Sequence, residues 1–146
     1  MQQFHDEVRI DAPVEQVWGF ICDPAHLHDW SPQTEYSDVS GPLDQVGTTF
    51  VQTARIMGHE MKGTLEVLEV EPHRLLRLRS DQGVNMVFRF EPQGGGTLLT
   101  LEGDYQMPHL PAFLQKLMSK SYVDRNMRHQ LENIKALVEA SVAVPV

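Results

Sequence analysis

The stretch between residues 34 and 107 most constrains the fold, because turn signals divide it into runs of the length of β-strands. Glycine permits left-handed backbone conformations, and proline interrupts helices and central strands, so both residues favour turns. The spacing of these turns predicts a meander of antiparallel strands. The turn signals are Gly41-Pro42, Gly47, Gly58, Pro72, Gly83 and Gly94-Gly95-Gly96.

Three of these strands alternate apolar and polar side chains, as expected when one face of a sheet is buried and the other is wet. Val87 falls on the face that is predicted to meet water. The strand around residues 50–57 shows no clear phase, so its register stays open. The apolar positions are Met61, Leu65, Val67, Met86, Phe88, Phe90, Leu99, Leu101, Tyr105 and Met107.

A strand and two short helices are predicted before this region. Residues 4–11 alternate as a strand does, although Asp6 interrupts the apolar phase. Proline at the first helical position and the i, i+3, i+4, i+7 pattern of residues 13–21 predict a helix with one buried face. Trp18 lies on that face, so we expect it to be buried. Asp23-Pro24 ends this helix, and a second helical turn follows.

One long C-terminal helix is predicted over residues 112–140, because this stretch contains neither glycine nor proline. A stripe of residues recurs there at alternating steps of four and three, which is the spacing of one helix face. We expect its apolar members, from Phe113 and Leu117 to the last turns, to point toward the sheet. The stripe comprises Phe113, Leu117, Lys120, Asp124, Met127, Leu131, Ile134 and Val138.

The order of these elements predicts the fold class. A strand, two short helices, six strands and a long helix follow one another without the βαβ alternation of parallel sheets. We therefore predict an α+β fold with an antiparallel sheet and helices on one side, in a single domain spanning residues 1–146.

Composition argues against several classes of partner and site. A net charge of −8 disfavours nucleic acid, and no apolar run is long enough for a membrane span, so we expect no integral membrane association. Cys22 is the single cysteine, which excludes an internal disulfide and a thiolate cluster. We expect no metal, no cofactor and a cytoplasmic location, while monomer and homodimer both stay open.

The element order and four local phrases resemble the START-like (SRPBCC) superfamily, which includes polyketide cyclase/dehydrase-like proteins. The resemblance implies a helix-grip fold, in which a curved seven-stranded antiparallel sheet grips the last helix over an internal cavity. It implies no single reaction, because such relatives include carriers, cyclases and chaperone cofactors. The phrases are IDAPVEQVWGFICDPAHLHDWSP, VGTTF, LEVLEVEPHRLLRLRS and LENIKALVEA.

A curved sheet and a straight helix leave a concavity that is lined by inward residues of both, so these residues are the candidates for ligand contact. Lys120 and Asp124 interrupt the apolar stripe one turn apart, and two interpretations of them stay open. They anchor a polar group of the ligand in the cavity, or they form a surface ion pair. The ligand-binding candidates are Trp30, Tyr36, Phe50, Met61, Met86, Phe88, Leu101, Tyr105, Phe113, Leu117, Lys120 and Asp124.

Three functions are compatible with these residues. The favoured one is binding of a hydrophobic small molecule such as a lipid, a polyketide or a quinone-like compound. The alternative is a polyketide cyclase or dehydratase in which Tyr105, Lys120 and Asp124 act on the substrate. The third is an interaction module with a collapsed cavity, which would expose a large apolar patch. Binding is favoured over catalysis because no acid–base signature is recognisable.

Overall fold

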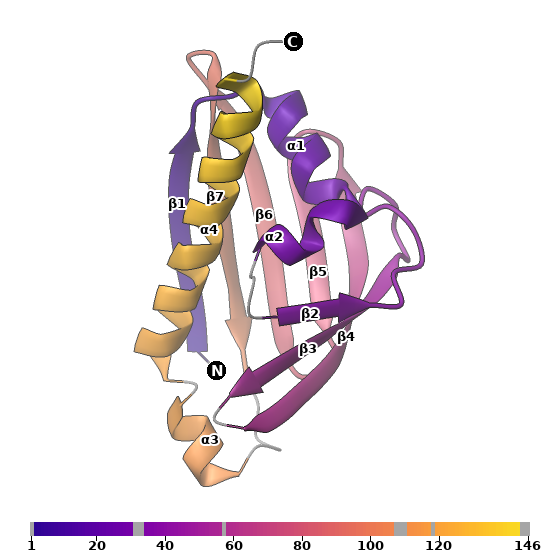
Figure 1. Cartoon of the computed structure of the whole chain (residues 1–146), viewed down its shortest axis with the longest axis vertical. Helices are drawn as coiled ribbons and strands as arrows, with labels where there is room; N and C mark the ends of the chain where they lie inside the picture. Colours follow the sequence, from indigo (N-terminus) through magenta and orange to yellow (C-terminus); the bar gives the residue numbers. More distant parts are fainter. Residues whose placement is uncertain (1, 31–33, 57, 107–110, 118, 144–146) are drawn as a thin grey trace.

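Seven strands form one antiparallel sheet, as predicted. The computed structural model describes residues 2–30, 34–56, 58–106, 111–117 and 119–143. The strand order is β1-β7-β6-β5-β4-β3-β2, so β2 to β7 form a meander and β1 pairs with β7 (Figure 1). The strands are β1 Gln2–Ile10, β2 Thr34–Ser37, β3 Thr49–Ile56, β4 His59–Glu71, β5 Leu75–Ser80, β6 Val84–Gln93 and β7 Gly96–Tyr105.

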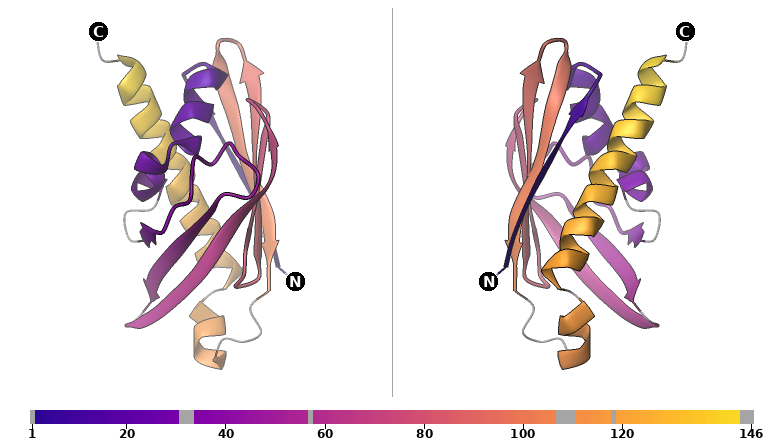
Figure 2. Two further views of the ribbon diagram at one scale, coloured as in Figure 1. Left: turned by 90° about the vertical axis from the view of Figure 1, so that its right-hand side faces the viewer. Right: turned by 90° about the vertical axis from the view of Figure 1, so that its left-hand side faces the viewer.

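The sheet is curved, and it contains a bulge in β4 and a closely packed glycine in β7. The pairing of β4 with β5 shifts between Val67 and Glu69, which marks a bulge that bends and twists β4. Gly103 in β7 permits close packing, since a side chain there would collide with the carbonyl group of Asn85 and the ring of Phe4. The strands β2 and β3 and the start of β4 curl toward the side where the helices lie (Figure 2).

The short helices follow β1 and cover the concave face of the sheet. They are α1 Val14–Cys22, the 3-10 turn η1 Pro24–His26 and α2 Leu27–Trp30. The carboxylate of Asp23 accepts a hydrogen bond from the backbone N–H of Ala25 at 2.9 Å and so caps η1. Trp18 is buried, as predicted, and its ring lies edge-on to that of Phe90 at a centroid distance of 5.0 Å.

The predicted long C-terminal helix is present, but its predicted span over residues 112–140 is wrong. The segment forms two helices, α3 Ala112–Leu117 and α4 Lys120–Ala143. Ser119 separates them: its side-chain oxygen accepts a hydrogen bond from the backbone N–H of Tyr122 at 3.3 Å, which gives α4 its own N-cap. The prediction for Phe113 is also wrong, because this side chain on α3 is 52% exposed.

The predicted stripe is confirmed in the second half of α4, where Leu131, Ile134 and Val138 are almost fully buried. Toward the start of α4 the buried position is Val123, whereas Lys120 and Asp124 lie on the surface. The interruption of the apolar stripe in the sequence therefore reflects a helix face that turns toward solvent at its first turns.

Helix α4 also covers the edge strand β1. Lys120, Arg128 and Lys135 donate hydrogen bonds to the backbone carbonyl groups of residues 3, 7 and 9, at 3.3, 3.0 and 2.7 Å. Arg128 also pairs with the carboxylate of Asp6 at 3.3 Å, which explains the polar residue in the apolar phase of β1. These contacts occupy carbonyl groups that an uncovered edge strand would offer to another chain.

The prediction that Val87 meets water is wrong, because this side chain is buried on the convex face of the sheet. Its cross-strand neighbours there are Arg77 and Glu102. Arg77 pairs with Glu69, and Glu102 pairs with Arg89, so long charged side chains surround Val87 and exclude solvent.

Within the described part of the chain, no helix is both long enough and apolar enough to cross a membrane.

Candidate functional site

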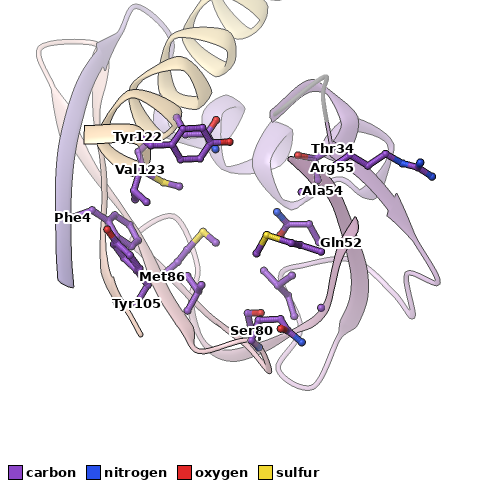
Figure 3. A pocket seen from close by; sticks show the side chains of 17 residues that line it. Phe4, Thr34, Gln52, Ala54, Arg55, Ser80, Met86, Tyr105, Tyr122 and Val123 are labelled. Carbon is purple, nitrogen blue, oxygen red and sulfur yellow. Dashed lines mark hydrogen bonds between the residues drawn. The ribbon is translucent and has the colours of Figure 1, made fainter. Parts of the chain in front are cut away.

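A pocket lies between the first turns of α4 and the curled strands of the sheet (Figure 3). It has a volume of about 170 Å³ and is partly open to solvent. All seven strands and α4 contribute to its wall, so the pocket exists only when the whole sheet is assembled. Its lining residues are Phe4, Thr34, Gln52, Ala54, Arg55, Met61, Gly63, Leu65, Ser80, Gln82, Val84, Met86, Tyr105, Tyr122, Val123, Asn126 and Met127.

We call this the outer pocket. Its lining is mainly apolar and adaptable. Met61, Met86 and Met127 reach it from three different elements, and methionine side chains fit varied apolar shapes because they are flexible and polarisable. Arg55 is the charged residue among those that line it, and its side chain points away from the centre of the pocket in Figure 3. The outer pocket is therefore suited to an uncharged, largely apolar molecule.

A second, smaller pocket of about 60 Å³ adjoins the first and reaches toward α2; we call it the inner pocket. Its aromatic lining residues are Trp30, Tyr36 and Phe50. Tyr36 packs against Trp30 and Phe50, with ring centroids 6.4 and 6.0 Å apart. The residues that it shares with the outer pocket are Thr34, Gln52, Leu65, Met86, Asn126 and Met127.

Two buried polar atoms at the inner pocket have no hydrogen-bond partner among the described residues. They are the indole Nε1 of Trp30, on α2, and the amide oxygen Oε1 of Gln130, on α4. Indole Nε1–H only donates, whereas an amide oxygen only accepts. Buried groups of this kind are normally paired, so their occurrence together at one pocket marks a position for a polar atom.

The two predicted tyrosines occupy different pockets. Tyr36 lines the inner pocket, where burial raises the pKa of its phenol above the ordinary value of 10. Tyr105 lines the outer pocket, where burial and then the charge of Asp124 raise its pKa, while Lys120 acts in the opposite direction. Both phenols are therefore protonated at neutral pH and are suited to hydrogen bonding rather than to proton abstraction.

The structure resolves the register of β3, which the sequence left open. Phe50, Gln52 and Ala54 point toward the pockets at every second position. The phase was ambiguous because an inward position carries the polar Gln52 and another carries the small Ala54. Polar and small residues on an inward face are expected where the sheet borders a pocket instead of a packed core.

Six of the twelve ligand-binding candidates line the two pockets. Met61, Met86 and Tyr105 line the outer pocket, and Trp30, Tyr36, Phe50 and Met86 line the inner pocket. Phe88 and Leu101 lie in the solid core of the sheet and line neither pocket. The side chain of Leu117 lies outside the described part of the structure. Phe113 is exposed, and its ring centroid lies 5.0 Å from that of His59.

Lys120 and Asp124 do not line either pocket, which corrects the expectation that they border the cavity. Their side chains are 59% and 46% exposed and form an i, i+4 ion pair with Nζ 3.1 Å from Oδ2. Lys120 also donates to the backbone carbonyl group of Gln3. The charges remain in water because burial of either one would be costly. The surface interpretation of this pair is therefore the one that the geometry supports.

Sequence reasoning missed the polar residues of α4 that border the pockets, Asn126 and Gln130. These amides lie one helical turn apart and flank Met127, so they share the edge of the buried stripe. A pair of uncharged amides at this spacing was the available signal, because a helix edge that faces only water more often carries charged residues.

Cys22 and His26 line neither the outer nor the inner pocket. Cys22 is buried beside Asp44, and burial and then this charge raise the pKa of its thiol to about 12, so it is not a nucleophile. His26 pairs with Asp29 at 2.9 Å on the surface. In the described ranges no three His, Cys, Asp or Glu residues come together as a metal site.

Comparisons with known proteins agree with this architecture. The family model described as "Polyketide cyclase / dehydrase and lipid transport" matches residues 1–139. No curated protein matches the sequence.

Solved structures from several bacteria share the fold. TTHA0849 from Thermus thermophilus is 23% identical with a TM-score of 0.79, over 97% of this chain and 100% of that one. NE0264 from Nitrosomonas europaea is 19% identical with a TM-score of 0.73, over 97% of each chain. An AHSA1-like protein from Aeromonas hydrophila is 20% identical with a TM-score of 0.68, over 97% of this chain and 94% of that one.

Identities this low show a common fold and no common activity, whereas the family model matches nearly the whole sequence. The chain therefore belongs to the polyketide cyclase/dehydrase and lipid transport family, as its START-like sequence phrases implied.

Proposed function

We propose that this protein binds an uncharged hydrophobic small molecule, such as a lipid, a polyketide or a quinone-like compound, without transforming it. The observation that carries the proposal is the outer pocket, whose wall of methionines, aromatic rings and neutral polar groups comes from every strand and from α4. Such a pocket removes apolar surface from water, and its few polar groups orient the ligand.

The alternative, a cyclase or dehydratase that uses Tyr105, Lys120 and Asp124, gains no support from this geometry. Only Tyr105 lines a pocket, while the other two form a surface ion pair. General acid–base catalysis requires the groups to lie within hydrogen-bond reach of the reacting atoms. A cytoplasmic location and the choice between monomer and homodimer stay predictions from the sequence.

Native mass spectrometry of the purified protein tests the proposal directly. We expect a copurified nonpolar molecule, whose mass identifies the ligand class. A neutral fluorescent probe, N-phenyl-1-naphthylamine, should bind to protein from which this molecule has been extracted, with increased emission in the apolar pocket. A protein that carries no such molecule and does not bind the probe would contradict the proposal.

A matched pair of substitutions in β3 tests whether the probe occupies the outer pocket. Ala54→Phe places a ring in the pocket, whereas Thr53→Phe adds the same ring on the opposite face of the strand. We expect Ala54→Phe to weaken probe binding by roughly tenfold or more and Thr53→Phe to leave it unchanged. Equal affinities for the two variants would mean that the probe binds elsewhere.

A further inference from the structure

We infer that the inner pocket receives a neutral hydroxyl group of the ligand, which accepts a hydrogen bond from Trp30 Nε1–H and donates one to Gln130 Oε1. The inference rests on the proposed binding function and narrows the ligand to an apolar molecule with an alcohol or phenol at one end. It also assigns an orientation in which this end enters first.

The first argument is the unpaired hydrogen-bonding capacity of the inner pocket. Trp30 is 2% exposed, and its Nε1, like Oε1 of Gln130, is buried without a partner among the described residues. Both residues line the same pocket, Trp30 from α2 and Gln130 from α4. An unpaired buried donor and an unpaired buried acceptor each destabilise the unliganded protein, and one group that satisfies both recovers this loss on binding.

The second argument is chemical complementarity. A ketone only accepts hydrogen bonds and would leave Gln130 Oε1 unpaired, whereas a hydroxyl group both accepts and donates. Among the described residues that line the inner pocket, none is charged, so a carboxylate would lose its hydration without gaining a counter-ion. A hydroxyl group is therefore the simplest head that meets both requirements.

The third argument is the continuity of the two pockets. Leu65, Met86 and Met127 line both of them, so a ligand with its head in the inner pocket places its body against the apolar wall of the outer one. The inner pocket, about 60 Å³ in volume, exceeds the roughly 10–15 Å³ that one water molecule requires. It is large enough for a small head group and too small for the body.

A set of three probes of the same shape tests the inference. 2-Naphthol carries the hydroxyl group, 2-methylnaphthalene replaces it with a methyl group of similar size, and 2-naphthoate carries a negative charge. Affinities are measured by displacement of N-phenyl-1-naphthylamine from ligand-free protein. We expect 2-naphthol to bind roughly tenfold more tightly than 2-methylnaphthalene, and 2-naphthoate to bind most weakly.

Substitutions identify the atoms responsible for this preference. Gln130→Leu removes the acceptor with little change of shape, and Trp30→Phe removes the donor. Both should abolish the preference for 2-naphthol while retaining binding of 2-methylnaphthalene. Gln45→Leu makes the same change on an exposed loop outside both pockets and should leave the preference intact. Gln130→Leu keeps the test decisive if Trp30→Phe does not fold.

Amide and indole spectra provide a readout that is independent of affinity. The chain contains two tryptophans, Trp18 and Trp30, so its nitrogen–proton NMR spectrum shows two indole signals, which one substitution assigns. 2-Naphthol should move the Trp30 signal and leave the Trp18 signal in place, whereas 2-methylnaphthalene should move neither by a comparable amount.

The outcomes separate this inference from the proposed function. Equal affinity for 2-naphthol and 2-methylnaphthalene, or a preference that survives Gln130→Leu, overturns the hydroxyl site, leaves the binding function standing and assigns the polar pair to a bound water. Failure of every neutral probe to bind overturns both. Tightest binding of 2-naphthoate overturns the neutral head.

Discussion

The two halves of α4 face the same sheet but have different surroundings. In the second half Leu131, Ile134 and Val138 are almost fully buried, and this part of the helix lies beside α1 and against β1 (Figure 2). In the first half Val123, Asn126 and Met127 border the outer pocket instead. We call these the packed half and the pocket half.

This difference separates stability from binding within one helix. The packed half is close-packed, so loss of side-chain volume there leaves a void that the surroundings cannot fill. The pocket half already borders open space, and its side chains can change without creating a new cavity. The comparison predicts that substitutions in the packed half reduce the free energy of unfolding, while those in the pocket half mainly change affinity.

The largest effect is expected for Trp18 on α1, the helix that fills the packed half. Its ring contacts Phe90 and is buried. Trp18→Ala should reduce the free energy of unfolding by about 3–5 kcal/mol, measured by urea denaturation. Gln16→Ala, on the same helix, is the control and should change it by less than about 0.5 kcal/mol. A loss below about 1 kcal/mol for Trp18→Ala would mean that Trp18 contributes little to the packing of α1 against the sheet.

A direct comparison of the halves comes next in size. Leu131→Ala in the packed half should reduce the free energy of unfolding by about 2–5 kcal/mol. Met127→Ala, four residues earlier in the pocket half, should reduce it by about 1 kcal/mol or less, because no closed void forms. Urea denaturation of the two variants under identical conditions measures both values. Equal losses would contradict the division of α4 into two halves.

Glu139 provides a smaller, pH-dependent test in the packed half. Its carboxylate accepts hydrogen bonds from Lys135 at 2.6 Å and from the backbone N–H of Asp11 at 2.7 Å, and these contacts lower its pKa below the ordinary 4.5. Because the folded pKa is the lower one, the carboxylate stabilises the fold above about pH 4.5. This contribution is lost as the pH falls through the lowered value.

Glu139→Gln should therefore reduce the free energy of unfolding by roughly 0.2–1 kcal/mol at pH 7. The difference from the original protein should shrink as the pH decreases below about 4.5. Thermal or urea unfolding of both proteins at pH 7 and near pH 4 measures it. A difference that stays constant over this range would show that the carboxylate does not titrate as its contacts imply.

The smallest effect is expected for the surface ion pair at the start of the pocket half. Lys120→Met and Asp124→Asn should each change the free energy of unfolding by no more than about 0.5 kcal/mol, because exposed ion pairs contribute little. Binding of N-phenyl-1-naphthylamine should also stay unchanged, since neither residue lines a pocket. A loss of probe affinity in either variant would show that Lys120 or Asp124 takes part in binding.

Local sequence patterns were sufficient for most of the fold. Turn residues and alternation predicted the antiparallel sheet, and helical spacing predicted the burial of Trp18 and of Leu131, Ile134 and Val138. These features depend on which face of a helix or strand is buried, and the spacing of apolar residues in the sequence indicates that face directly. The break before α4 was missed because a serine N-cap is a single hydrogen bond within a strongly helical sequence.

The pockets depended on tertiary structure. Residues such as Phe88 and Leu101 have the same apolar phase as Met86, yet they pack in the core while Met86 borders both pockets. Phe88 packs against the ring of Trp30 on α2, at a centroid distance of 5.4 Å, whereas open space lies opposite Met86. This difference depends on where the helices lie on the curved sheet. Trp30 and Gln130 are 100 residues apart in the sequence (130 − 30), so only the packing of α2 against α4 places their unpaired atoms at one pocket.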